Sequence, residues 1–74
     1  GVPDEAAAKE ACAMAISEGY AITWGGQPAA VDGQGYLVLR GTAADPRGTG
    51  GSSAFTCWTA GEADWVSYVE VSSE

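Results

Sequence analysis

The segment Ala54-Phe55-Thr56-Cys57-Trp58-Thr59 decides the expected fold, because it joins strand-forming residues to one of the chain's two cysteines. Aromatic and β-branched residues favour extended structure, and the side chains of a strand alternate between its two faces. Phe55 and Cys57 therefore share one face, while Thr56 and Trp58 share the other. If Cys57 has a partner inside the protein, its face is the buried one.

The other cysteine, Cys12, lies far from Cys57 in sequence. The spacing is not that of a Cys-x-x-Cys redox motif, and no carboxylates cluster nearby to complete a metal site. One structural disulfide is the simplest interpretation, and two free buried thiols are the alternative. Closing a loop of about 46 residues would stabilise a small domain by roughly 4 kcal/mol in the chain-entropy model. A structural disulfide would also indicate an oxidising compartment, such as the periplasm, the cell surface or the extracellular space.

The segment from Asp4 to Glu18 predicts a helix. Pro3 and Asp4 are typical helix-start residues, and the segment is rich in alanine, the strongest helix former. Gly19 fits the position just after a helix end. The helical stripe expected to face the interior consists of Ala8, Cys12, Ala15 and Ile16.

After the helix, the pattern changes to strands and turns. The four expected strands occupy residues 20–24, 36–40, 54–59 and 65–71. Residues 28–31 can resume the first strand after a bulge or break, and Asp32-Gly33 is a hairpin-turn signal. The glycine- and serine-rich composition of residues 41–53 predicts a mobile loop, and residues 61–64 predict a turn.

This order of elements predicts an α+β fold with a single domain over residues 1–74. We expect the N-terminal helix to pack on a four-stranded antiparallel sheet as a two-layer sandwich, because the links between strands suit hairpins. A parallel sheet would need a second helical segment for its crossover, and the sequence has none.

Alternation along the strands divides the sheet into two faces once Cys57 is turned toward the helix. The inward set is Leu37, Leu39, Phe55, Cys57, Trp65, Val69 and Val71. The outward set holds the candidate binding residues Tyr36, Val38, Arg40, Trp58, Val66 and Tyr68. Aromatic residues and arginine are enriched in protein interfaces. Two alternatives stay open: cross-strand packing explains the same residues without a partner, or the strand phase differs from the expected one.

Composition excludes several kinds of chemistry. The chain has 10 acidic and 3 basic residues, a formal net charge of −7, and no histidine. The acidic balance argues against binding nucleic acid, and the lack of histidine removes Ser-His-Asp and Cys-His catalysis and the usual zinc ligand. The glycine-rich segment 48–53 lacks the lysine and the helix of a phosphate-binding loop. We therefore expect no enzyme, no cofactor, no metal site and, since long apolar runs are missing, no membrane span.

Several segments together resemble small exported bacterial domains of the PepSY-like kind. These are the helix segment Ala11-Cys12-Ala13-Met14-Ala15-Ile16, the strands 36–39 and 65–71, and Phe55-Thr56-Cys57-Trp58. The resemblance covers residues 6–71, and the long loop 41–53 and Trp65 depart from it. It implies one helix with four strands, often a helix-to-strand disulfide, and a non-catalytic binding or inhibitory role. Gly1 in place of Met agrees with a processed chain that has lost a signal peptide or a tag.

The leading functional hypothesis is a secreted or periplasmic, non-enzymatic protein-binding or accessory module that uses the outward sheet face. Its partner would be another protein or a copy of itself. One alternative is a self-assembling structural subunit that uses the same face or a free sheet edge. Another is an inhibitor of an extracellular hydrolase that acts through the loop 41–53, with Asp45-Pro46-Arg47 at its tip.

Overall fold

The protein has one helix and a five-stranded antiparallel sheet in the computed structural model, which describes residues 1–16, 19–47 and 51–73. The elements are α1 (Glu5–Ile16), β1 (Ala21–Trp24), β2 (Ala30–Val31), β3 (Leu37–Ala44), β4 (Ser52–Glu62) and β5 (Trp65–Ser73). The strand order is β1-β3-β4-β5, and β2 also pairs with β3. The α+β class is confirmed, and the expected count of four strands is wrong by one.

The additional strand is β2, which lies along the same edge of β3 as β1. Ala30 pairs with Val38, while β1 pairs with the far end of β3 from Gly41 to Ala44. The break between β1 and β2 stays close to β3, because the Gly25 amide donates to the Arg40 carbonyl at 2.9 Å. The residues after β1 thus return to the sheet. This agrees with the prediction that residues 28–31 can resume the strand after a break.

The turn between β2 and β3 forms where the sequence placed it. The Asp32 carboxylate accepts backbone N–H groups from Gln34 at 2.9 Å and from Tyr36 at 3.0 Å. The Asp32 amide also donates to the Tyr36 carbonyl at 2.9 Å. An aspartate that bonds to backbone amides ahead of it is a common way of closing a tight turn.

β3 and β4 take up much of the segment expected to be a mobile loop. Residues 41–44 belong to β3 and residues 52–53 to β4, so the prediction of a loop over 41–53 is wrong at these positions. Gly41, one of the glycines in that segment, serves packing instead. A Cβ at Gly41 would lie 2.6 Å from the Thr23 carbonyl oxygen and 3.2 Å from the Phe55 ring. Residues 45–51 make the connection, and 48–50 lie outside the described residues.

Backbone hydrogen bonds of Asp4 fix the start of α1. The Asp4 carbonyl accepts the first helical hydrogen bond from the Ala8 amide at 2.9 Å. The Asp4 amide donates to the Ala63 carbonyl at 2.9 Å, which ties the start of α1 to the β4–β5 turn. The predicted end of the helix at Ser17 and Glu18 lies outside the described residues. Gly19, with φ of 87°, has the positive φ expected after a helix.

The core lies between α1 and one face of the sheet. A disulfide joins Cys12 of α1 to Cys57 of β4 across a Cα–Cα distance of 6.2 Å, and both residues are fully buried. The predicted disulfide is confirmed, and the inward phase of β3 and β4 follows it. The buried apolar set is Ala8, Cys12, Leu37, Leu39, Phe55 and Cys57. Buried Thr59 satisfies its hydroxyl by donating to the Leu37 carbonyl at 3.0 Å.

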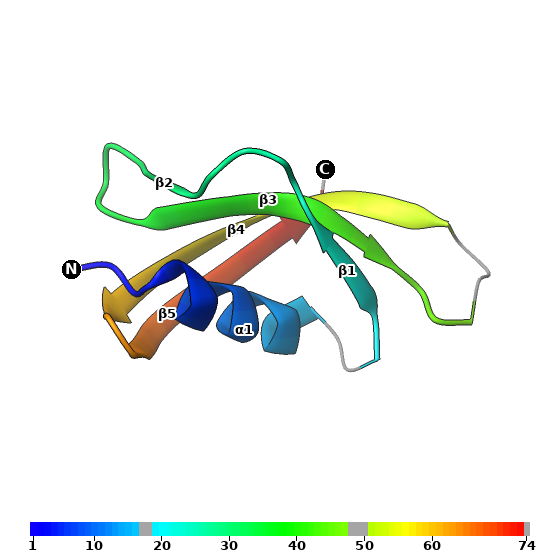
Figure 1. The fold of residues 1–74 in the computed structure, drawn as a ribbon, viewed down its shortest axis with the longest axis horizontal. Helices are drawn as coiled ribbons and strands as arrows, with labels where there is room; N and C mark the ends of the chain where they lie inside the picture. Colours follow the sequence, from blue (N-terminus) through cyan, green and yellow to red (C-terminus); the bar gives the residue numbers. More distant parts are fainter. Residues whose placement is uncertain (17–18, 48–50, 74) are drawn as a thin grey trace.

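The helix covers only part of this face, so a two-layer sandwich describes the molecule incompletely. Figure 1 shows the β3–β4 hairpin continuing well beyond the end of α1. Beside the helix, the Trp24 ring packs edge-on against Phe55 with ring centroids 5.5 Å apart. Lys9 Nζ lies 5.7 Å from the centroid of the same Trp24 ring. Trp24 therefore extends the cover that α1 begins on this side of the sheet.

The β4–β5 hairpin contains a register shift that changes the phase of β5. Ala60 pairs with Tyr68, but the next residue, Gly61, pairs with Val66, so Ser67 is an extra residue on β5. Gly61 has φ of 151°, and a Cβ there would collide with the Trp65 carbonyl. Trp65 was expected to point inward and is 64% exposed, so that prediction is wrong. The prediction assumed strict alternation along β5, and the one unpaired residue, Ser67, interrupts that alternation.

Replacing both cysteines, as in Cys12→Ala/Cys57→Ala, should lower the free energy of unfolding by about 4 kcal/mol in the chain-entropy model. For a domain of this size that corresponds to a melting temperature lower by roughly 15 °C or more. Thermal melts followed by far-UV circular dichroism, with and without a reductant, measure the effect. Equal melting of the oxidised and reduced protein would contradict a stabilising role of the disulfide.

The substitution Gly41→Ala should destabilise the protein by about 1–3 kcal/mol, since the new methyl group overpacks a close contact between β1, β3 and Phe55. Gly33→Ala is the matched control, because a Cβ there meets nothing within 4 Å. Urea denaturation of both variants gives the comparison. Similar midpoints for the two variants would argue against the tight packing at Gly41.

Candidate functional site

The face of the sheet opposite α1 is called the outer face. The registers of β3, β4 and β5 arrange its side chains in three cross-strand rows. The rows are Ala60 and Tyr68, joined by Tyr36 through its stacked ring, then Val38, Trp58 and Glu70, and finally Arg40, Thr56 and Ser72. A solvated sheet face is usually polar. This one carries three aromatic rings and a valine within two neighbouring rows.

Two tyrosines form the most ordered part of the outer face. The rings of Tyr36 and Tyr68 are stacked, with centroids 5.3 Å apart and planes 23° from parallel. They come from the two sides of β4, where the small side chain of Ala60 leaves room for them to meet. The Tyr68 hydroxyl donates to Glu70 Oε1 at 3.1 Å, and Tyr68 is 41% exposed. The pair presents a flat aromatic surface. Stacking on Tyr36 and the hydrogen bond to Glu70 both restrict the rotamer of Tyr68.

The same hydrogen bond changes the acidity of Tyr68. It raises the pKa of Tyr68 above the ordinary value, because the phenolate would lose the bond and would then face the Glu70 carboxylate. Slight burial and the negative charge of Glu70 act in the same direction. The stability that follows from this shift is fully present below about pH 10, the ordinary tyrosine value, and is lost as the pH rises through the folded pKa.

Beside the tyrosine pair, the outer face is hollowed where β2 and the preceding segment rise along β3. One open hollow of about 330 Å³ lies between residues 25–28, Val38 and Arg40. A second of about 190 Å³ is lined by residues 30–32, Val38, Arg40 and Trp58. The Arg40 guanidinium is exposed and bonds to no side chain in the described part of the chain. It thus offers a cation in hollows that Val38 and Trp58 also line, with Asp32 on the wall of the second.

The structure brings five of the six candidate binding residues together on the outer face and separates the sixth. Val66 lies beyond the register shift, opposite Gly61. It lines a shallow depression together with Ala7, Ala11 and Met14 of α1, on the side of the sheet that bears the helix. Strict alternation from Tyr68 would have placed Val66 on the outer face. The extra residue Ser67 is the physical reason for the difference.

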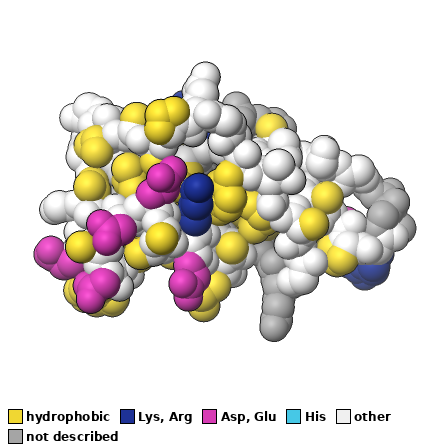
Figure 2. Space-filling model, in the orientation of Figure 1, with side chains coloured by type: hydrophobic (Ala, Val, Ile, Leu, Met, Phe, Trp, Pro, Cys, Tyr) yellow, Lys and Arg dark blue, Asp and Glu magenta, His cyan; other side chains and the backbone are white. Residues whose placement is uncertain are grey.

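The helix-bearing side has a different character from the outer face. Figure 2 shows acidic side chains gathered over the end of this side where Figure 1 places α1 and the β4–β5 turn. Within residues 1–16, 19–47 and 51–73, no three side chains of the metal-binding types lie close enough together to hold an ion. No helix in the same residues has the length and apolarity needed to cross a membrane.

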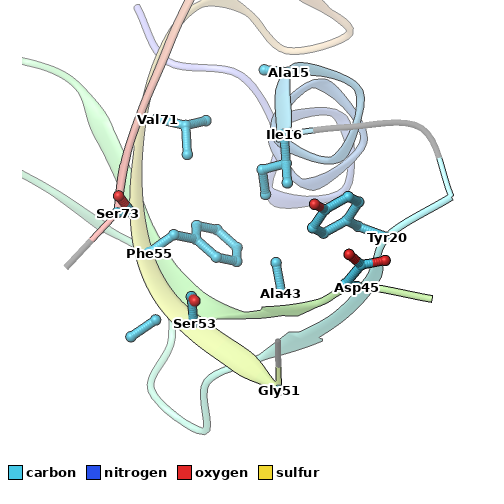
Figure 3. A pocket seen from close by; sticks show the side chains of 11 residues that line it. Ala15, Ile16, Tyr20, Ala43, Asp45, Gly51, Ser53, Phe55, Val71 and Ser73 are labelled. Carbon is cyan, nitrogen blue, oxygen red and sulfur yellow. The ribbon is translucent and has the colours of Figure 1, made fainter. Parts of the chain in front are cut away.

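A further hollow, of about 430 Å³, opens where α1 ends and the sheet continues. Figure 3 shows Phe55, Ile16 and Val71 around its apolar interior, with Tyr20 and Asp45 at its rim. Sequence reasoning missed it, because Ala43, Asp45, Gly51 and Ser53, which form part of its lining, fall in the segment expected to be a loop. Phe55 is only 3% exposed and packs on Trp24, so the floor belongs to the core. Asp45 already accepts a hydrogen bond from the Arg47 amide at 2.9 Å.

Comparison with protein-family models, with curated proteins and with solved structures finds no match to this chain. The resemblance to PepSY-like domains therefore stays a prediction. Function has to be argued from the surfaces themselves.

Glu70→Gln should lower the pKa of Tyr68 toward its ordinary value, because the carboxylate charge that opposes the phenolate is removed. A pH titration that follows the Tyr68 ring carbons by NMR measures the change. Glu62→Gln is the matched control, since it removes a carboxylate that makes no hydrogen bond to Tyr68. A Tyr68 titration midpoint that is the same in all three proteins would contradict the assigned cause.

Proposed function

We propose that the protein is a non-enzymatic protein-binding module that uses its outer face. The observation that carries this proposal is the continuous aromatic and apolar strip of Tyr36, Val38, Trp58 and Tyr68, which ends at Arg40. Aromatic residues with few rotatable bonds bury much area at a low cost in entropy, which suits a binding surface. The alternative, in which these residues only stabilise the sheet by cross-strand packing, does not account for the open hollows beside Val38.

The chemistry of the strip indicates what the partner presents. The hollows beside Val38 and Trp58 suit an apolar side chain. Arg40 has no acidic partner within the described chain, so a carboxylate from the partner would complete a charge-assisted pair at the edge of the contact. We infer a protein partner with an apolar side chain next to an acidic one.

The site of action in this proposal is an oxidising compartment, either the periplasm or the extracellular space. The Cys12–Cys57 disulfide supports this location, because structural disulfides form and persist in such compartments. A removed signal peptide and membership of the PepSY-like domains remain parts of the same hypothesis.

Two other functions remain as alternatives. A self-assembling subunit would pair the outer face or a sheet edge with a second copy, and sedimentation at two concentrations would reveal it. A hydrolase inhibitor would act through the β3–β4 connection, where Arg47 is exposed and its backbone amide is bonded to Asp45 at 2.9 Å. Deleting residues 45–50 should abolish inhibition and leave binding by the outer face intact.

The double substitution Trp58→Ser/Tyr68→Ser should abolish capture of the partner by the immobilised protein from the native secreted fraction. The physical reason is the loss of both aromatic anchors, each of which is expected to contribute more than about 1 kcal/mol of binding free energy. Quantitative mass spectrometry of the captured proteins is the measurement. Far-UV circular dichroism should show an unchanged fold, since the disulfide and the inner face are untouched.

Tyr20→Ser is the matched control, because it removes an aromatic side chain from the helix-bearing side. It should capture the same partner as the unmodified protein. Arg40→Gln should weaken capture and make it less sensitive to salt. Undiminished capture by the Trp58→Ser/Tyr68→Ser variant would refute the outer face as the binding surface.

A further inference from the structure

The last strand, β5, leaves one edge of the sheet unpaired. It ends the order β1-β3-β4-β5, so it pairs with β4 on one side only. In an antiparallel strand every second residue directs its N–H and C=O groups away from the paired neighbour. Within residues 1–16, 19–47 and 51–73, no backbone hydrogen bond from outside the sheet reaches β5. Its far side therefore presents a row of free backbone donors and acceptors.

The opposite edge of the sheet is interrupted and β5 is not. That edge consists of β1 with 4 residues and β2 with 2 residues, and Pro28 lies in the break between them. Short edge strands and proline are devices that discourage pairing with another chain. β5 has 9 residues without proline or lysine, and its single charged residue is Glu70. The bulge at Ser67 affects only its first part, so residues 68–73 pair with β4 without interruption and form a regular edge.

The chemistry of this edge indicates what can occupy it. Water satisfies the free backbone groups in the isolated protein. An extended backbone is the protein element that can replace water along the whole row, because it offers N–H and C=O groups at the same spacing. A helix has no such free groups along its length. The edge of β5 therefore fits an extended segment that adds a strand to the sheet.

One flank of α1 borders the position of such an added strand. The helix packs mainly on β5 (Figure 1), and Lys9 on its other flank lies over Trp24 of β1. On the β5 flank, Ala11 and Met14 line a hollow of about 180 Å³ together with Val66 of β5. Met14 is 77% exposed. Because side chains alternate along a strand, every second side chain of an added strand would lie on the helix side, next to this flank.

The charged side chains near this edge are acidic. Glu10 and Asp64 line the hollow between α1 and the start of β5, and Glu70 lies on β5 itself. The three basic residues of the chain lie elsewhere: Lys9 and Arg47 form ion pairs with other carboxylates, and Arg40 lies on β3. The negative potential along β5 therefore favours a cationic segment over an acidic one.

We propose that the free edge of β5 binds an extended basic segment of another protein, which adds a strand to the sheet. Backbone hydrogen bonds along residues 68–73 hold the segment. Apolar side chains on one face of the added strand pack beside Ala11 and Met14, where the adaptable methionine covers them. Lysine or arginine side chains on its other face lie next to Glu70. This site is the edge of the sheet, and it needs no side chain of the aromatic strip on the outer face.

The test adds a synthetic peptide of alternating valine and lysine, blocked at both ends, to the isotope-labelled protein. Amide hydrogen exchange followed by NMR is the measurement. With the peptide at saturation, alternate amides of residues 68–73 should exchange at least about tenfold more slowly, while those of β1 should not change. The affinity should fall severalfold as ionic strength rises from about 0.05 to about 0.5 M. A Val/Glu peptide of the same pattern should not bind.

Methylation of the peptide backbone separates strand addition from attraction between side chains. N-methyl groups on the valines and N-methyl groups on the lysines remove N–H groups that point to opposite sides of the added strand. Only the peptide that keeps the N–H groups facing β5 should bind. Binding by both methylated peptides, or by neither, would overturn the proposal.

Two matched pairs of variants test the side chains beside the edge. Met14→Ser should weaken binding of the Val/Lys peptide about fivefold, because it removes the apolar cover of the added strand. Val31→Ser, at an exposed apolar residue of β2, should leave the affinity unchanged. Glu70→Gln should weaken binding more than Glu5→Gln, which removes the same charge on the Lys9 side of α1. Equal losses within either pair would contradict the proposal.

The location of the effect separates this site from the other surfaces. Trp58→Ser, which alters the outer face, should bind the Val/Lys peptide as the unmodified protein does. Slowed exchange in β1, or peptide shifts centred on the Trp58 indole, would place the peptide elsewhere and overturn the proposal. Slowed exchange in β5 on concentrating the protein without peptide would assign the edge to a second copy of the chain, and would overturn it as well.

Discussion

The Cys12–Cys57 disulfide is the constraint on which the rest of the structure depends. Only Ala8 and Cys12 of α1 are buried, so the helix contributes little apolar area to the core. Small residues allow the helix to approach the sheet closely, but they provide a small hydrophobic driving force. The disulfide supplies what is missing, because it restricts the unfolded chain by about as much free energy as a small domain has in total. It also decides which face of β4 is buried.

The extent to which sequence predicted the fold follows from this constraint. Near Cys57 the faces of β3 and β4 follow strict alternation, and their inward residues were predicted correctly. At the other end of β5 the prediction for Trp65 failed, because Ser67 is one residue too many and alternation cannot continue through it. Gly61 is the local signal, since a glycine inside a strand often marks a bulge. The composition of residues 41–53 misled in the opposite sense: it suggested a loop, but Gly41 within it serves the close packing of β1 on β3.

The candidate site was predictable to the same degree and for the same reason. Tyr36, Val38, Arg40, Trp58 and Tyr68 share a face because all lie within the unbroken register around Cys57. The hollows beside Val38 were not predictable, since they depend on where β2 returns to the sheet.

The charged side chains of the outer face bear on which partners that face could accept. Arg40 stands on the outer face, where Asp32 lines the same hollow and Glu70 lies in the neighbouring row. A net charge of −7 alone would suggest a uniformly acidic surface that repels acidic proteins everywhere. Arg40 nevertheless places a positive charge within the outer face. A partner carboxylate would meet that charge at the edge of the aromatic strip, so the net charge of the chain does not by itself exclude an acidic partner from this face.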